Sequence, residues 1–155
     1  MSPRKLLILS SIAIVGVWGA YMKLPRGIRN NNPGNIRHGD NWVGMASVQK
    51  DDSFVTFTDA KYGIRAMVKI FRSYRNRGLV TLSQIISTWA PTNENDTLSY
   101  IIAAEKSSGL DRYQVVSEAE GDYQALIKAI IKHENGAAFA EYYSLAKIDE
   151  GIALA

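Results

Sequence analysis

Residues 123–136, YQALIKAIIKHENG, decide the fold of this 155-residue chain. Apolar residues recur there at intervals of three and four, the spacing of a helix with one buried face. They are Tyr123, Leu126, Ile127, Ile130 and Ile131. Extending the same face by one turn reaches Glu134, and Gly136 behind it is a typical helix C-cap. The pattern predicts a central buried helix that ends in a core-facing carboxyl group.

Glu134 is the leading candidate for a catalytic acid. Burial disfavours the anionic form of a carboxyl group, and so does the negative end of a helix dipole. A carboxyl group that stays partly protonated near neutral pH can act as a general acid. The alternative is a glutamate at a frayed helix end, turned to water. Glu94, flanked by two asparagines in a loop, is the second catalytic candidate, and Glu105 competes because it shares a helix face with Leu98 and Ile101.

Composition excludes several kinds of chemistry. With 46% hydrophobic residues, the chain can bury one globular core. It has no cysteine, which excludes disulfides, thiol nucleophiles and thiolate metal sites. His38 and His133 are the only imidazoles and lack the paired spacing of metal ligands, and no phosphate-binding loop is present. We therefore expect no metal and no cofactor.

The net charge of +3 is unevenly distributed. Residues 23–91 carry eleven Lys and Arg against four Asp, whereas residues 92–155 carry five Lys and Arg against eleven Asp and Glu. A basic half could hold an anionic polymer, although the two halves could equally attract each other.

The N-terminus is predicted to be a membrane anchor. Residues 6–22, LLILSSIAIVGVWGAYM, are uncharged and, at about 1.5 Å per residue, just long enough to cross a bilayer core. Arg4 and Lys5 would keep the N-terminus in the cytoplasm. We predict residues 1–23 as a transmembrane signal anchor and residues 24–155 as one periplasmic domain, in a single-pass inner-membrane protein or in a virion membrane. A cleaved signal peptide and a buried core helix are the alternatives.

The remaining pattern predicts an α+β domain that is mostly helical. Residues 41–49 and 53–57 flank the polar residues 50–52 and are predicted to pair as a small β-hairpin. Asp59, Thr81 and Asp96 are typical N-caps of helices that run to about Arg77, Trp89 and Ser108. Residues 137–146 are predicted to form a last helix.

Asparagines surround a predicted tight turn. In Asn32-Pro33-Gly34-Asn35, proline at the second position and glycine at the third predict a type II turn. Asn30, Asn31, Asn32 and Asn35 supply amides that suit a ligand rich in hydroxyl and amide groups. The equal alternative is that these amides only satisfy the backbone of an irregular loop.

Several motifs together resemble a known family. They are GIRNNNPGNIR, Trp42 with Gly44, FVTF, YGIRAM, IISTWAPTNEN with Thr97 and Tyr100, and KAIIKHENG. In this order they are similar to phage and prophage proteins described as virion structural proteins or endolysins with a lysozyme-like, lytic transglycosylase-type domain. The resemblance covers residues 26–136. A weaker resemblance to flagellar-type N-acetylglucosaminidases has the same parts in circularly permuted order.

The resemblance implies a peptidoglycan-cleaving glycosidase, used by a phage for host lysis or wall penetration. It implies a muramidase or lytic transglycosylase that breaks the β-1,4 bond between N-acetylmuramic acid (MurNAc) and N-acetylglucosamine (GlcNAc). Glu134 would be the acid, and Glu94 is a candidate second carboxylate at roughly 5 to 9.5 Å if the enzyme is a hydrolase. Asn32, Asn35 and Tyr100 would position the sugar, and Trp42 would offer an apolar face to it.

Two other functions remain open from the sequence. A membrane-anchored virion structural protein could bind peptidoglycan strands without cleaving them. The basic face of the helix after Asp59, with Lys61, Arg65, Lys69 and Arg72, could instead bind nucleic acid. We expect no nucleic-acid partner, because the predicted anchor places that face outside the cell.

Overall fold

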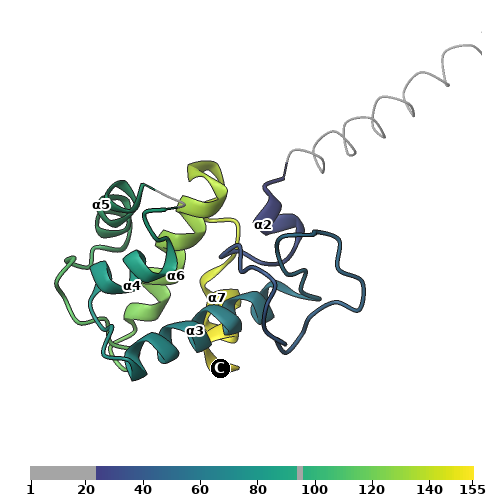
Figure 1. Ribbon diagram of the computed structural model, residues 1–155, viewed down its shortest axis with the longest axis horizontal. Coiled ribbons are helices and arrows are strands. Elements are labelled where there is room, and N and C mark those ends of the chain that lie inside the picture. The colour runs from purple at the N-terminus through teal and green to yellow at the C-terminus, as the bar shows by residue number, and fades with distance from the viewer. Residues whose placement is uncertain (1–23, 94–95) are drawn as a thin grey trace, which may run out of the picture.

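Helices carry the fold in the computed structural model, which describes residues 24–93 and 96–155 (Figure 1). In chain order they are α2 (Arg26–Arg29), α3 (Ala60–Asn76), α4 (Leu82–Trp89), α5 (Thr97–Ser108), α6 (Asp122–Asn135), the 3₁₀ turn η2 (Ala137–Phe139) and α7 (Leu145–Ala153). The predicted central helix is α6, which contacts α2, α3, α5 and α7. The segment between α2 and α3 forms an irregular lobe beside these helices.

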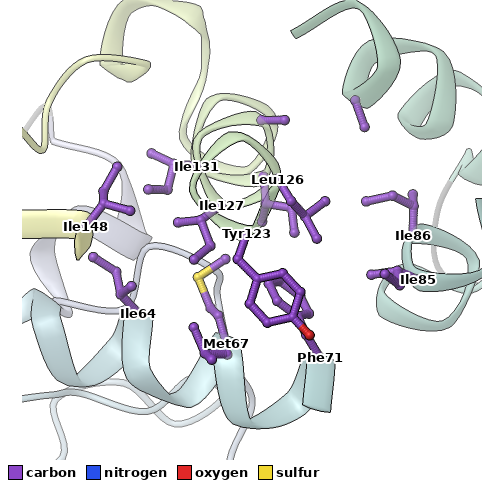
Figure 2. Packing of buried hydrophobic residues seen from close by; sticks show 14 of the residues in the cluster. Ile64, Met67, Phe71, Ile85, Ile86, Tyr123, Leu126, Ile127, Ile131 and Ile148 are labelled. Carbon is purple, nitrogen blue, oxygen red and sulfur yellow. The ribbon is translucent and has the colours of Figure 1, made fainter. Parts of the chain in front are cut away.

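The apolar stripe of α6 forms the centre of the core (Figure 2). The five residues of the stripe are each 2% exposed or less. They meet Ile64, Met67 and Phe71 of α3, Ile85 and Ile86 of α4, and Ile148 of α7. Each fully buried aliphatic or aromatic side chain contributes about 1.5–3 kcal/mol to folding. This stripe therefore fixes the position of α6, and with it the position of the helix end that carries Glu134.

The predicted helix starts at Asp59, Thr81 and Asp96 are confirmed. The Asp59 carboxylate accepts a hydrogen bond from the Lys61 backbone N–H, and Asp96 accepts one from Ser99. Thr81 forms a full capping box with Gln84. Because each cap satisfies backbone donors that the helix itself leaves unpaired, the local sequence is sufficient to set these boundaries.

The predicted hairpin is wrong, and with it the α+β fold class with a lysozyme-like domain. In the described residues, β-structure is limited to three isolated antiparallel bridges, two of which, Arg37 with Phe54 and Met45 with Phe57, lie in the lobe. Side-chain bonds and a few scattered backbone bonds, such as that from the Ala46 N–H to the Thr56 carbonyl at 2.9 Å, take the place of a continuous ladder there. The Gln49 amide accepts from the Thr56 backbone N–H at 2.7 Å and donates to the Thr56 carbonyl at 3.0 Å. Hydrogen bonds from side chains to the backbone compete with the backbone bonds that would form a strand ladder.

The predicted last helix is also wrong in its position. In residues 137–144 only the short turn η2 forms, and the helix α7 begins at Leu145. Ser144 has extended backbone angles, and its hydroxyl accepts from the Lys147 backbone N–H. This is an N-cap, so it ends the preceding segment and starts a helix that packs on α3.

The prediction of a single-pass membrane protein is corrected as well. No helix within residues 24–93 and 96–155 is both long enough and apolar enough to cross a bilayer. The predicted anchor, residues 1–23, lies outside the described residues.

Candidate functional site

Glu134 lies in the last turn of α6 and is half-buried. The helix ends at Gly136, whose backbone N–H donates to the Lys132 carbonyl and whose φ of 92° favours glycine. Because the stripe of α6 is locked in the core, the carboxyl group at its end has a fixed position.

Two side chains from distant parts of the chain donate hydrogen bonds to Glu134. The Asn35 amide Nδ2 donates to Oε2 at 2.9 Å, and the Tyr100 hydroxyl donates to Oε1 at 3.0 Å. Thus both carboxyl oxygens have a donor, one from the turn after α2 and one from α5. The structure brings together three of the residues that the sequence analysis assigned to the site, and they fix the carboxyl plane.

Tyr100 belongs to the core, because only 1% of its surface is exposed. Burial, followed by the charge of Glu134 and the hydrogen bond to it, raises the pKa of the Tyr100 phenol well above its usual range. The hydroxyl therefore stays protonated and remains a donor. The His133 ring stacks on the Tyr100 ring, with centroids 3.5 Å apart, and covers one face of it. Tyr100 positions the carboxyl group and does not itself present a surface to a ligand.

Of the four asparagines around the predicted turn, three hold the loop together and one bonds Glu134. Asn30 donates to Asp51, Asn31 to the Phe57 carbonyl, and Asn32 to the carbonyls of Ile36 and Val55. Asn32 has no exposed surface, so its amide holds the lobe together and cannot contact a sugar. Asn35, with a φ of 49°, is the one of the four that reaches Glu134.

The turn before Asn35 differs from the prediction. The Asn35 backbone N–H donates to the Asn32 carbonyl at 2.9 Å, which closes the turn, but Gly34 does not have the positive φ of a type II turn. Glycine is needed at this position for space instead. A Cβ on Gly34 would lie 2.9 Å from Cζ2 of Trp89 and 3.0 Å from Sδ of Met67.

Asn135 ties the end of α6 to the same turn. Its buried amide Nδ2 donates to the Pro33 carbonyl at 2.9 Å and to the Ile131 carbonyl at 3.0 Å. Glu134 and Asn135 thus bind neighbouring residues of one turn, Asn35 and Pro33. These two hydrogen bonds hold the Glu134 carboxyl group and the turn in a fixed position relative to each other.

An open pocket of about 340 Å³ lies in front of Glu134. Three aromatic side chains line it, but polar atoms supply more of its lining surface than apolar atoms do, and its lining residues include one acid, Glu134, and one base, Arg37. The lining residues are Gly34, Asn35, Ile36, Arg37, Phe54, Ile70, Tyr74, Trp89, Ala90 and Glu134. Concave sites that combine aromatic side chains with convergent polar groups are typical places for a ligand to bind.

The chain is similar to a bacteriophage protein. Over 116 residues it is 40% identical to Protein P5 of Pseudoalteromonas phage PM2, and the match covers 72% of this chain and 71% of that protein. The chain belongs to the family of phage Protein P5. The predicted link to a phage protein is thereby confirmed. No protein-family model matches the chain, so no lysozyme-like domain is shown.

In this member of the phage P5 family, the predicted site residue Trp42 does not line the pocket, and the predicted site residue Glu94 lies outside the described residues. Trp42 is half-buried against the core and is not among the residues that line the pocket. Its indole N–H is buried without a hydrogen-bond partner in the described structure. Glu94 lies outside the described residues. Within those residues, no group of three or more metal-ligating side chains is present.

Sequence reasoning missed four residues that form the pocket. Trp89, Tyr74 and Phe54 supply its aromatic walls, and Arg37 supplies its positive charge. A signal was present for Trp89, which is the last residue of a short helix, where a large aromatic side chain can cover the helix end. Phe54 was assigned to a strand, and Arg37 lies two residues after Asn35, so both could be placed only once the fold of the lobe was known.

Proposed function

We propose that this chain is a peptidoglycan-cleaving glycosidase that breaks the β-1,4 bond between MurNAc and GlcNAc. The observation that supports this most is the position of Glu134, an acid held by two donors beside a pocket with aromatic walls. Aromatic faces pack on the apolar faces of sugar rings, and a positioned acid is what glycosidic bond cleavage requires. A member of the phage P5 family would use this activity for host lysis or wall penetration.

The role of Glu134 is proton transfer to the leaving oxygen. The protonated carboxyl group donates to O4 of the departing GlcNAc as the bond between that oxygen and C1 of MurNAc breaks. General acid catalysis of this kind contributes about 10²–10⁴-fold to the rate. Tyr100 and Asn35 hold the carboxyl group in place during this step, so the proton is aimed at one position in the pocket.

The acid that lines the pocket is sufficient for the chemistry of a lytic transglycosylase. Glu134 is the one carboxylate among the lining residues of the described structure. Asp51, in the neighbouring lobe, is engaged by Arg26 and Asn30. In that reaction the C6 hydroxyl of MurNAc attacks its own C1 while its proton passes to Glu134, so no second carboxylate is required. This leaves a 1,6-anhydro end and restores the protonated acid, in agreement with what the sequence resemblance implies.

Mass spectrometry of the fragments released from purified peptidoglycan tests the proposal with the full chain. We expect anhydro-MurNAc ends from wild type and a rate lower by about 10²–10⁴-fold for Glu134→Gln. Glu120→Gln is the matched control, because Glu120 is exposed and is not among the residues that line the pocket. Reducing ends in place of anhydro ends would indicate hydrolysis. Binding without release would indicate a non-catalytic peptidoglycan-binding protein and contradict the proposal.

A further inference from the structure

Two buried amide oxygens near Glu134 have no hydrogen-bond partner in the described structure. They are Oδ1 of Asn35 and Oδ1 of Asn135. The nitrogen of each amide is engaged, since Asn35 donates to Glu134 and Asn135 donates to two backbone carbonyls. A buried polar atom without a partner is costly, so the surroundings of these two oxygens require an explanation.

Both oxygens lie against Gly27, a buried residue of α2. A Cβ on Gly27 would lie 2.5 Å from Oδ1 of Asn135 and 2.9 Å from Oδ1 of Asn35. It would also lie 2.9 Å from the carbonyl oxygen of Asn32. The Cα hydrogen that takes the place of a Cβ in glycine therefore points toward three oxygens. Contacts of the type Cα–H···O are weak hydrogen bonds, so the glycine supplies a partner to both amide oxygens.

Hydrogen bonds hold the backbone of Gly27 in this contact. Its carbonyl accepts a hydrogen bond from the Asn32 backbone N–H at 2.8 Å, and the Asn32 carbonyl accepts one from the Asn35 backbone N–H at 2.9 Å. Gly27 and the turn that carries Asn35 are thus one hydrogen-bonded unit. In addition, α2 contacts α6, the helix that carries Glu134 and Asn135.

The two amides are also held from their other ends. Asn135 is 6% exposed and cannot turn its amide away without losing its bonds to two backbone carbonyls. Asn35 cannot turn away without losing its bond to Glu134. Non-bonded carbon and oxygen atoms do not approach to 2.5 Å, so a side chain in place of the Gly27 hydrogen would break one of these bonds or displace α2.

We propose that Gly27 is a positioning residue of the site: because it has no side chain, Asn35 and Asn135 can pack against α2 and hold the Glu134 carboxyl group. Gly27 is not among the residues that line the pocket, so it acts through the two asparagines and not on a ligand. The inference rests on the proposed glycosidase function for its effect on rate. The placement of the carboxyl group can be measured without cleavage.

Gly27→Ala in the full chain tests the effect on catalysis. With soluble peptidoglycan strands as the substrate, we expect kcat per folded molecule to fall about tenfold or more, because a displaced acid is poorly aligned with the bond that it protonates. KM should stay within about twofold of the wild-type value, because Gly27 does not line the pocket. Gly151→Ala is the matched control. Gly151 is a buried glycine of α7 where a Cβ would lie 2.5 Å from a side-chain carbon of Ile64, so this variant should lose stability and keep its kcat.

NMR of the isotope-labelled full chain tests the geometry without requiring cleavage. Glu134→Gln should shift the side-chain amide signals of Asn35, because it removes the charge to which Nδ2 donates. The same substitution should leave these signals unshifted in the Gly27→Ala protein and shift them as usual in the Gly151→Ala protein. If Gly27→Ala does not fold, Asn135→Ala is added, which removes the closest contact and should restore folding while the contact with Asn35 remains.

Each outcome distinguishes the inference from the proposed function. A wild-type kcat in Gly27→Ala, an unaltered response of the Asn35 signals, or an equal fall in kcat for Gly151→Ala would overturn the role of Gly27. A double variant that remains unfolded would overturn it as well, because relief of the closest contact should be sufficient. If the Asn35 signals lose their response but wild type releases no fragments, the proposed catalysis fails while the positioning role of Gly27 stands.

Discussion

The Tyr100 hydroxyl donates a hydrogen bond to Oε1 of Glu134 across 3.0 Å, although the tyrosine is 1% exposed and the carboxyl group faces an open pocket. A core side chain thus sets the orientation of a group at the surface. Core tyrosines usually find a partner for their hydroxyl, because an unpaired buried polar atom is costly. Here the partner is the proposed acid, so core packing and site geometry depend on each other.

Tyr100→Phe separates these two roles. It removes the hydroxyl but keeps the ring that packs in the core and stacks on His133. The hydroxyl fixes the position of the carboxyl group, so we expect the rate of peptidoglycan cleavage to fall about tenfold or more when it is removed. Initial rates measured together with the thermal unfolding midpoint test this.

Tyr113→Phe is the matched control for the loss of a hydroxyl, because Tyr113 is 76% exposed. It should leave the rate unchanged. A Tyr100→Phe protein with the wild-type rate would show that the hydroxyl does not hold the acid in its working position. If the Tyr100→Phe protein has the wild-type cleavage rate per folded molecule but a lower unfolding midpoint, Tyr100 contributes to the core and not to the site.

His133 should make stability depend on pH below about 6.5. Burial of its face against Tyr100 lowers the pKa of His133, while the charge of Glu134 acts in the opposite direction. A histidine whose pKa is lower in the folded than in the unfolded state destabilises the fold as it protonates. Its contribution is therefore complete above the unfolded pKa of about 6.5 and is lost as the pH falls through the folded pKa.

His133→Phe keeps an aromatic ring that can stack on Tyr100 and removes the titratable imidazole. Urea unfolding at a series of pH values from 7.5 to 4.5 should show a smaller loss of stability on acidification for this variant than for wild type. His38→Phe is the control, because it removes an imidazole whose ring bonds the Asp51 carbonyl and does not stack on Tyr100. Parallel pH profiles for wild type and His133→Phe would contradict the assignment.

Asn135→Ala should both destabilise the protein and impair the site. The change removes the donor to the Pro33 carbonyl and leaves that buried group unpaired, which costs about 1–3 kcal/mol of unfolding free energy. The turn that carries Asn35 also loses its second link to α6. Lys132→Ala, an exposed position in the same helical turn, should show neither effect. Urea unfolding and initial rates measured on the two variants decide the question.

Much of the helical frame could be predicted from the sequence because its signals are local. The buried stripe of α6 follows from the 3.6-residue period, and caps such as Asp59 and Thr81 satisfy donors only a few residues away. The same reasoning placed Glu134 at the end of α6. Asn35 was singled out by its asparagine-rich turn and Tyr100 by the resemblance, but their contact with Glu134 could not be predicted, since contacts across 99 and 34 residues leave no periodic signal.

The lobe could not be predicted for a physical reason. Its segments alternate in polarity like paired strands, but their backbone groups are divided between the side-chain amides of Gln49 and Asn32 and a few scattered backbone partners, so only isolated bridges form. Local sequence patterns also could not show which tryptophan lines the pocket. Trp89, rather than Trp42, lines the pocket because it packs against Gly34, a residue 55 positions earlier in the chain.

That contact supports a last prediction, Gly34→Ala. The new Cβ would lie 2.9 Å from Cζ2 of Trp89, closer than side-chain carbons approach, and 3.0 Å from Sδ of Met67. The methionine can move, whereas the indole is held against Phe71, with ring centroids 5.6 Å apart. We expect a loss of about 1–3 kcal/mol in unfolding free energy and a higher KM for peptidoglycan, since the displaced ring is a pocket wall.

A double-mutant cycle with Trp89→Phe isolates the contact. Phenylalanine lacks the far part of the indole ring that the new methyl group would strike. Trp89→Phe should therefore cost less stability in the Gly34→Ala protein than in wild type, with a coupling of about 0.5 kcal/mol or more. Additive effects would mean that the chain accommodates the methyl group without moving Trp89, and the glycine would then have to be explained by the turn alone.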